Sequence, residues 1–248
     1  MNSIYDSSLQ SDSRWGLLGT VLWTGVVAVA FVVTQIVAAI VFVSVSQNLP
    51  DPSQIPDLKA FTDNGDVLAV STWATFFVCG FLVLVAITAK PGSSLSKYLA
   101  LKPVTWRVLL AGVAALLCFL FVLEAVNSLF ERPIPESMLL MYRSAQHQVL
   151  FWTAIVIAAP VFEEVFFRGF LHSSLERSFL GVTGTILITA MFWSVIHFQY
   201  DTYEVIVIFI MGLLLGISRW LTGSLYVPIL IHALNNFVSN IQIAYLTS

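Results

Sequence analysis

Charged residues are scarce in this chain. Only 10% of its 248 residues are Asp, Glu, Lys or Arg, whereas 58% are hydrophobic, and the mean hydropathy is +0.89. Soluble globular domains carry about 25% charged residues, so the composition excludes that class. The formal net charge of -3 gives no electrostatic reason to expect a nucleic-acid partner. The composition therefore predicts an integral membrane protein.

Cysteines are rare as well, and two common protease signatures are absent. Cys79 and Cys118 both lie in apolar runs, where cysteine behaves as a small hydrophobic residue. We therefore expect neither a disulfide framework nor a thiolate metal site. The chain contains no His-Glu-x-x-His zinc signature and no Gly-x-Ser-x-Gly nucleophile elbow. These absences argue against the best-known zinc and serine hydrolase sites.

Long apolar runs, in contrast, occur along the whole chain. A helix needs about 20 residues to cross the ~30 Å hydrocarbon core of a bilayer. Seven runs approach or exceed this length, at Gly16–Ser46, Val67–Ala89, Val108–Phe130, Val149–His172, Val182–Phe198, Tyr203–Leu221 and Ser224–Leu246. The expected fold is an all-α, polytopic transmembrane helical bundle with about seven spans, within a range of six to eight.

The loops predict the orientation. Between the second and third runs the chain carries Lys90, Lys97, Lys102 and Arg107 and no acidic residue. The preceding loop carries a single lysine, Lys59, against four aspartates. Basic loops face the cytoplasm, so we expect a cytoplasmic N-terminus. Short loops in a compact bundle favour a prokaryotic inner membrane.

The fourth run contains three ionisable residues within six positions, Glu163, Glu164 and Arg168. A charged residue at the centre of a membrane helix costs roughly 2.5 to 3.5 kcal/mol, so these side chains must face protein or a wet cavity. Glu164 and Arg168 have the spacing of a helical ion pair, which leaves Glu163 without a partner in its own turn. Pro160 has no N–H, so in an α-helix it frees the carbonyl of Val156 and favours an opening beside Glu163.

Two later runs carry polar pairs at four-residue spacing. Trp193 and His197 share one face of the fifth run, and His232 and Asn236 share one face of the seventh. Histidine exchanges protons near neutral pH, and an asparagine amide can donate to a developing negative oxygen. His172 is interpreted as an interhelical hydrogen-bonding residue, and Trp193 as a packing residue.

These motifs resemble a known family. The chain has Glu163-Glu164-x-x-x-Arg168, then Trp193-x-x-x-His197 and His232-x-x-x-Asn236, in this order on three hydrophobic spans, the fourth, fifth and seventh. The set is similar to the CPBP family, which includes the type II CAAX prenyl proteases and the Abi-like bacteriocin-processing enzymes. The family's second motif usually begins with Phe, where this chain has Trp193. The resemblance implies that residues 149–248 form the catalytic core, and residues 1–148 the N-terminal helices and loops, of one domain.

The resemblance implies an intramembrane endopeptidase. In that reading Glu163 and His197 position and deprotonate a water, and His232 and Asn236 hold the oxyanion. The expected partners are membrane lipid and a peptide or protein substrate, prenylated or not. A non-catalytic scaffold, immunity or peptide-binding protein that uses the same polar cluster is the competing hypothesis.

Some assignments stay open at this point. Glu164 and Arg168 are expected to support the base, but Glu164 itself is an alternative base. We expect a glutamate mechanism without cofactor, whereas zinc held by Glu163, His197 and His232 is the alternative.

The predicted spans also contain a conflict of depth. At ~1.5 Å per residue, Glu163 lies ~21 Å from the outer start of the fourth run, and His197 ~22 Å from the inner start of the fifth. In a ~30 Å core the two side chains would miss each other by roughly 13 Å. A common site therefore requires a fourth helix that extends towards Phe179, or a fifth helix that begins deeper or tilts.

Overall fold

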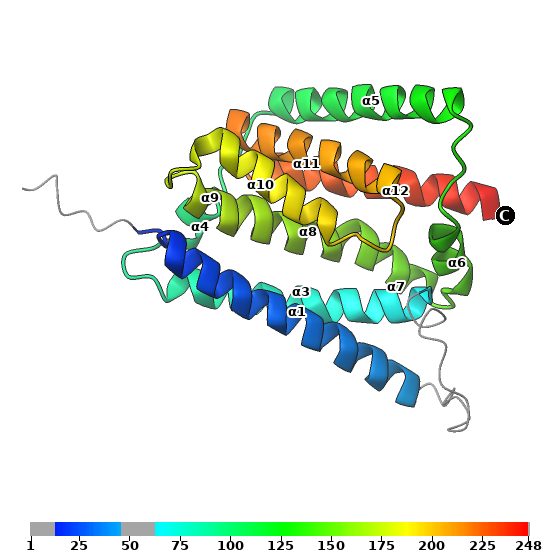
Figure 1. Ribbon diagram of the computed structural model, residues 1–248, viewed down its shortest axis with the longest axis horizontal. Helices are drawn as coiled ribbons and strands as arrows, with labels where there is room; N and C mark the ends of the chain where they lie inside the picture. Colours follow the sequence, from blue (N-terminus) through cyan, green and yellow to red (C-terminus); the bar gives the residue numbers. More distant parts are fainter. Residues whose placement is uncertain (1–12, 46–62, 248) are drawn as a thin grey trace, which may run out of the picture.

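The computed structural model describes residues 13–45 and 63–247, and this part of the chain is helical with no β-strand. The helices outside the fourth apolar run are α1 (Leu17–Val45), α3 (Gly65–Thr88), α4 (Leu95–Tyr98), α5 (Trp106–Leu129), α6 (Glu136–Ser144), α10 (Gly181–Val195), α11 (Thr202–Thr222) and α12 (Tyr226–Thr247) (Figure 1). The all-α prediction is therefore confirmed for the described residues.

The fourth apolar run forms one composite helix, Gln148–Leu175. Its segments are α7 (Gln148–Thr153), the π-helix η1 (Ala154–Ala158), α8 (Ala159–Glu164), the π-helix η2 (Val165–Leu171) and α9 (His172–Leu175). π-Helical turns are rare and often occur at functional sites. Here they flank the turn that carries Glu163 and Glu164.

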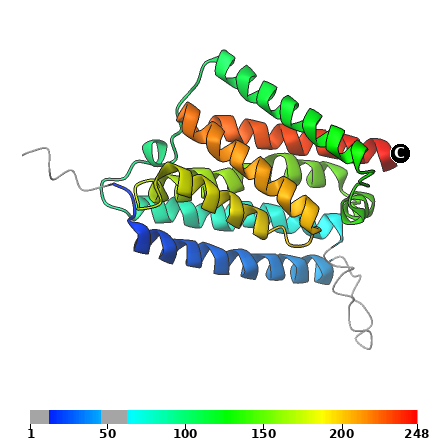
Figure 2. The same cartoon turned by 45° about the horizontal axis from the view of Figure 1, so that its top comes forward.

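The composite helix lies in the interior of the bundle. It packs against α3 on one side and against α12, α10 and α11 on the other, while α1 pairs with α3 and α5 covers α12 (Figures 1 and 2). Helices that belong to distant parts of the sequence thus surround it. This position gives its charged residues protein neighbours in place of lipid.

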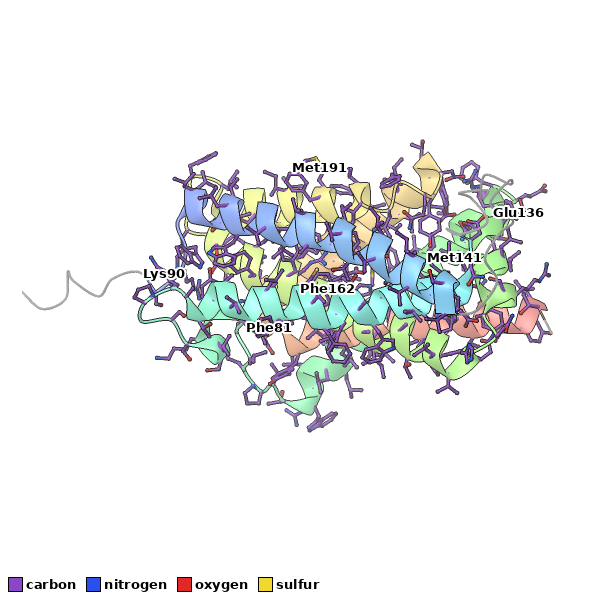
Figure 3. The ribbon with its side chains drawn as sticks, turned by 90° about the horizontal axis from the view of Figure 1, so that it is seen from below. Phe81, Lys90, Glu136, Met141, Phe162 and Met191 are labelled. Atoms are coloured by element: carbon purple, nitrogen blue, oxygen red, sulfur yellow. The ribbon has the colours of Figure 1, made fainter. Side chains whose placement is uncertain are left out.

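The outer faces of the bundle are apolar. Leu18 and Val29 on α1 are 73% and 66% exposed, and Phe121 on α5 is 76% exposed. Phe81 and Met191 are also exposed, whereas Phe162 is buried between the helices (Figure 3). Such extensive apolar surface is not tolerated in water on a monomeric protein. These faces are suited to lipid.

Helices occupy all seven predicted positions, but only five of them are long and apolar enough to count as candidate membrane spans among the described residues. These five are α1, α3, α5, the composite helix and α11. Of the other two, α10 has only 15 residues, and α12 is long enough but carries several polar side chains. The structure therefore supports an integral membrane protein with at least these five candidate spans.

The α3 helix starts within a segment whose sequence predicts a loop. Asn64 caps it by accepting hydrogen bonds from the N–H groups of Asp66 and Val67. Gly65 is required there, since a Cβ atom would lie 2.0 Å from the carbonyl oxygen of Met141. The rest of that loop, including Lys59 and two of the four aspartates, lies outside the described residues.

Candidate active site

Glu164 and Arg168 form the buried centre of the site. Both side chains are fully buried, and Arg168 Nη1 donates to Glu164 Oε1 at 2.8 Å, which confirms the predicted ion pair. Arg168 Nη2 donates to the carbonyl oxygen of Gly212 on α11 at 3.1 Å. The two charges thus neutralise each other, and the guanidinium also hydrogen-bonds to the neighbouring helix α11.

Gly212 allows α11 to approach this closely. A Cβ atom at this position would lie 3.0 Å from the side chain of Ala190 and 3.1 Å from the ring of Trp193. A larger residue would push α11 away from α10 and from the guanidinium of Arg168. The sequence motifs did not indicate this residue.

His232 on α12 is the third member of the buried network. Its Nδ1 lies 3.0 Å from Glu164 Oε1, the same oxygen that accepts from Arg168. A carboxylate only accepts hydrogen bonds, so Nδ1 carries the hydrogen and Nε2 is left for another contact. The other oxygen, Glu164 Oε2, is buried and has no hydrogen-bond partner among the described residues.

Glu163 is bound differently from Glu164. Its side chain is half-buried, and its Oε2 accepts a 2.5 Å hydrogen bond from the indole Nε1 of Trp193. The interpretation of Trp193 as a packing residue alone is therefore wrong. The signal was present in the sequence, because Trp brings an N–H donor to a position where the family usually has Phe.

His197 does not lie on the helix face predicted for it. The α10 helix ends at Val195, so His197 lies in the turn that follows. Its Nδ1 nevertheless lies 2.7 Å from the carbonyl oxygen of Trp193. A carbonyl only accepts, so Nδ1 carries the hydrogen and Nε2 has a free lone pair when the ring is neutral.

Trp193 lies at the centre of the group. Its ring centroid is 5.4 Å from that of His197 and 5.2 Å from that of His232, and the Arg168 guanidinium lies 4.9 Å from it. We refer to Glu163, Glu164, Arg168, Trp193, His197 and His232 as the glutamate–histidine cluster. Among these described residues, Glu163 makes no direct hydrogen bond or ion pair with either imidazole; the indole connects them.

The length of the composite helix reduces the depth conflict, and Glu163 lies level with Trp193, not with His197. This helix ends at Leu175, so Glu163 lies 12 residues, or ~18 Å, from that end. Trp193 lies 12 residues, again ~18 Å, from the start of α10 at Gly181, on the same side of the bundle. The sequence prediction placed the end of the fourth span near His172, so the extra turn removes ~4.5 Å of the difference. His197 lies four residues beyond Trp193, and the contact of its Nδ1 with the Trp193 carbonyl oxygen joins it to this level.

Asn236 reaches the composite helix through the opening made by Pro160. In the π-helix the N–H of Ala159 bonds to the carbonyl of Ala154, five residues earlier. The next bond in this register would join Ile155 to Pro160, which has no N–H. The Asn236 amide donates to this free Ile155 carbonyl at 2.9 Å. The predicted free carbonyl was that of Val156, which is wrong by one residue because an α-helical register was assumed.

A second set of buried polar residues supports the helix one turn beyond the cluster. Arg219 Nε on α11 donates to the carbonyl oxygen of Arg168 at 3.1 Å, and its Nη2 lies 3.4 Å from Ser173 Oγ. His172 is fully buried, but neither ring nitrogen has a hydrogen-bond partner among the described residues. Its Nε2 lies 3.6 Å from a carboxylate oxygen of Glu176, four residues along the chain, so the predicted interhelical hydrogen bond is wrong.

The turn after α10 extends the cluster to the surface. The Tyr200 ring stacks on that of His197 with 6.4 Å between centroids, and burial raises the pKa of Tyr200 to about 12. Asp201 caps α11, and the hydrogen bond from the Glu204 N–H lowers the pKa of Asp201, with a smaller contribution from Arg132. Tyr200 is therefore neutral and Asp201 ionised at neutral pH.

The described residues do not bring three His, Cys, Asp or Glu side chains together in an arrangement that could hold a metal ion. In particular, Glu163 is bound to an indole, and one imidazole is bound to Glu164.

Comparison with known proteins points to the same part of the chain. The family model described as type II CAAX prenyl endopeptidase Rce1-like matches residues 145–238, which contain all three motifs. No curated protein and no solved structure matches the chain. The matched family consists of proteases, so the match implies a hydrolase, and the apolar helices place it in a membrane. Residues 145–238 are thus similar to the Rce1-like type II CAAX prenyl endopeptidases, which confirms the resemblance to the CPBP family predicted from the motifs.

Proposed function

We propose that this protein is an intramembrane endopeptidase that hydrolyses peptide bonds of membrane-associated substrates with a water activated by Glu163. The observation that carries the proposal is the position of the Glu163 carboxylate. It is half-buried, carries no ion pair among the described residues, and is held by Trp193 beside two histidine rings. A carboxylate in such surroundings can take a proton from water.

In the proposed first step, a water lies between Glu163 and His197. The hydrogen on His197 Nδ1 is directed at the Trp193 carbonyl, so its Nε2 lone pair can accept a hydrogen bond from the water. Glu163 removes the other proton as the water oxygen attacks the scissile carbonyl carbon. When the C–N bond breaks, Glu163 returns this proton to the leaving amine.

His232 and Asn236 are proposed to stabilise the oxyanion. With Nδ1 bound to the Glu164 carboxylate, a protonated His232 ring can donate from Nε2 to the negative oxygen. The Asn236 amide has two hydrogens, and only one is required by the Ile155 carbonyl. The second hydrogen can therefore contribute to the same oxyanion site.

The geometry favours Glu163 over Glu164 as the base. Glu164 Oε1 already accepts hydrogen bonds from Arg168 and His232, and the side chain is fully buried. A carboxylate neutralised by an adjacent guanidinium is a poor proton acceptor. We assign Glu164 and Arg168 to positioning His232.

The proposed reaction needs no metal ion or other cofactor. Each proton transfer has a protein group as acceptor or donor. If the mechanism is correct, a zinc chelator such as 1,10-phenanthroline leaves the hydrolysis rate of the purified protein unchanged. A loss of activity that added Zn²⁺ restores would support zinc bound by Glu163, His197 and His232.

We also propose that the bundle crosses a prokaryotic inner membrane with a cytoplasmic N-terminus, and that α10, together with the turn after it, and α12 complete seven spans. The basic residues of the connection between α3 and α5 support this orientation. The substrate is a membrane-anchored or membrane-embedded peptide, and prenylation is one form of anchor.

The test is hydrolysis by the purified chain in liposomes. A mixed-sequence library of lipid-anchored peptides, with and without a prenyl group, is incubated with the protein, and the products are identified by mass spectrometry. We expect cleavage that is lost in the His197→Ala variant and retained in a matched control, His147→Ala, whose ring is exposed in the loop before α7. Full cleavage by His197→Ala rejects the mechanism, and the absence of products from the unaltered protein rejects the function.

A further inference from the structure

The two ends of the bundle differ strongly in charge. We call the end where α3 and α11 finish and α5 and α12 begin the basic end. Within the described residues it carries seven basic side chains and one acidic side chain, Glu176; the basic residues are Arg14, Lys90, Lys97, Lys102, Arg107, Arg177 and Arg219. The opposite end carries Arg132 and Arg143 against six acidic residues: Asp63, Asp66, Glu131, Glu136, Asp201 and Glu204. Lys90 and Glu136 mark the two ends in Figure 3. By the positive-inside rule, the acidic end faces away from the cytoplasm.

The short length of α10 places the cluster near the acidic end of the bundle. The α10 helix has 15 residues and is ~22 Å long, so it stops short of crossing a ~30 Å core. The chain then continues towards α11 as a non-helical turn, through His197 and Tyr200. Backbone without helical hydrogen bonds is tolerated at this depth only where it is buried in protein or lines a wet cavity. Because His197 is half-buried and Gln199 is exposed in this turn, we take the turn as the route by which water reaches the cluster from this end.

A cavity of about 400 Å³ lies along this route. It is lined by residues 132–137, in the connection after α5 and the first turn of α6, and by Gln199, Tyr200, Asp201 and Glu204, around the start of α11. Its size falls in the range of ligand-binding pockets, ~300 to 1,000 Å³. Tyr200 lines the cavity and stacks on His197, whose ring packs on that of Trp193, the residue that holds Glu163. The cavity and the proposed catalytic carboxylate are thus connected by successive side-chain contacts.

The charges of the cavity wall favour a cation. Arg132 Nη2 binds Asp201 Oδ2 at 2.7 Å, so these two residues neutralise each other, although Arg132 also lies near Glu204. The carboxylates of Glu136 and Glu204 have no ion-pair or hydrogen-bond partner of their own among the described residues. The wall therefore has an excess of negative charge, which attracts positively charged groups.

We propose that this cavity binds a cationic, extracytoplasmic segment of the peptide substrate and so delivers the scissile bond to Glu163 from outside the cytoplasm. The inference rests on the endopeptidase function proposed above and adds a side of the membrane and a substrate class to it. Substrates with lysine or arginine next to the cleavage site, displayed on the outer surface, are the class that fits.

The test uses cysteine labelling in membrane vesicles, with no need for cleavage. Ser137, half-buried in the cavity wall, is replaced by cysteine in a Cys118→Ala background; the remaining cysteine, Cys79, is fully buried. The matched control is Ser96→Cys on α4, at the basic end. We expect a membrane-impermeant maleimide to label Ser137→Cys in right-side-out vesicles and Ser96→Cys only in inside-out vesicles. Labelling of Ser137→Cys from the cytoplasmic side, or from neither side, overturns the proposal.

The second arm tests the ligand. Tetralysine peptide should slow the labelling of Ser137→Cys by about fivefold, the order expected for two partly exposed ion pairs, whereas tetraglutamate should not. The Glu136→Gln, Glu204→Gln double replacement should abolish this protection. Equal protection by both peptides, or protection that survives the double replacement, contradicts a cation site. If labelling is as expected but the protein hydrolyses no peptide, the endopeptidase function is rejected and the binding site stands. If the protein cleaves peptides but Ser137→Cys is labelled from the cytoplasmic side, the binding site is rejected and the endopeptidase function stands.

Discussion

Replacement by glutamine should affect catalysis at Glu163 and stability at Glu164. In Glu163→Gln, the amide oxygen can still accept the hydrogen bond from Trp193, so the cluster keeps its geometry. The amide cannot accept a proton from water. Because a general base contributes about 10²- to 10⁴-fold to the rate, we expect kcat to fall by that factor. The free energy of unfolding should fall by only about 1 kcal/mol, because the buried indole of Trp193 keeps an acceptor and exchanges a charged one for a neutral one.

Glu164→Gln should act mainly on stability. The change removes the carboxylate that pairs with the fully buried guanidinium of Arg168. Breaking a buried ion pair by removing one partner costs about 3 to 5 kcal/mol, because the other charge stays buried. We therefore expect a clear loss of folded protein, and a lower unfolding temperature for the part that folds.

Hydrolysis in liposomes and thermal unfolding in detergent micelles measure the two effects separately. Glu124→Gln is the matched control, since this glutamate is exposed on α5, and it should alter neither quantity. Hydrolysis at the unaltered rate by Glu163→Gln would refute the assignment of the base. A Glu164→Gln protein that is as stable as the unaltered chain but inactive would make Glu164 the base instead.

Three further changes test the surroundings of the base. Trp193→Phe removes the indole N–H that donates to Glu163, and a hydrogen bond to a charged acceptor is worth about 1.5 to 3 kcal/mol. We therefore expect kcat to fall at least about tenfold at constant KM. The control Trp152→Phe, away from the cluster, should leave steady-state kinetics unchanged. Gly212→Ala should destabilise the fold by about 1 to 3 kcal/mol in thermal unfolding, and Gly80→Ala, where a Cβ meets nothing within 4 Å, should not. Burial raises the pKa of Tyr200 from 10.0 to about 12, so the protonated phenol stabilises the fold below pH 10 and this contribution is lost as the pH rises to 12. Tyr200→Phe should flatten the pH dependence of unfolding in that window; an unchanged slope would contradict the buried phenol.

Local spacing in the sequence was sufficient for several features. Hydropathy placed a helix at each of the seven predicted positions, because the length of an apolar helix is a property of the segment itself. The Glu164–Arg168 pair followed from a four-residue spacing on one helix. The three motifs identified the family that the comparison found for residues 145–238.

The ends of the helices and their hydrogen-bond register were harder to predict from the sequence. The composite helix runs one turn beyond His172, α10 stops before His197, and a π-helical turn shifts the carbonyl freed by Pro160 from Val156 to Ile155. Each difference is one to three residues. Such small shifts depend on packing against neighbouring helices, which hydrophobic periodicity does not contain, and they decide whether two side chains meet.

The sequence by itself determined which residues of this protein are polar at membrane depth, since their cost in lipid requires protein or water beside them. Only the tertiary structure decided which of them touch. The indole of Trp193 binds Glu163, His232 shares Glu164 with Arg168, and the carbonyl of Gly212 accepts a hydrogen bond from Arg168 Nη2. These bonds join four separate helices, and hydrogen bonds form only within a few tenths of an ångström of an ideal distance. The relative positions of whole helices, and not the spacing within any one of them, set those distances.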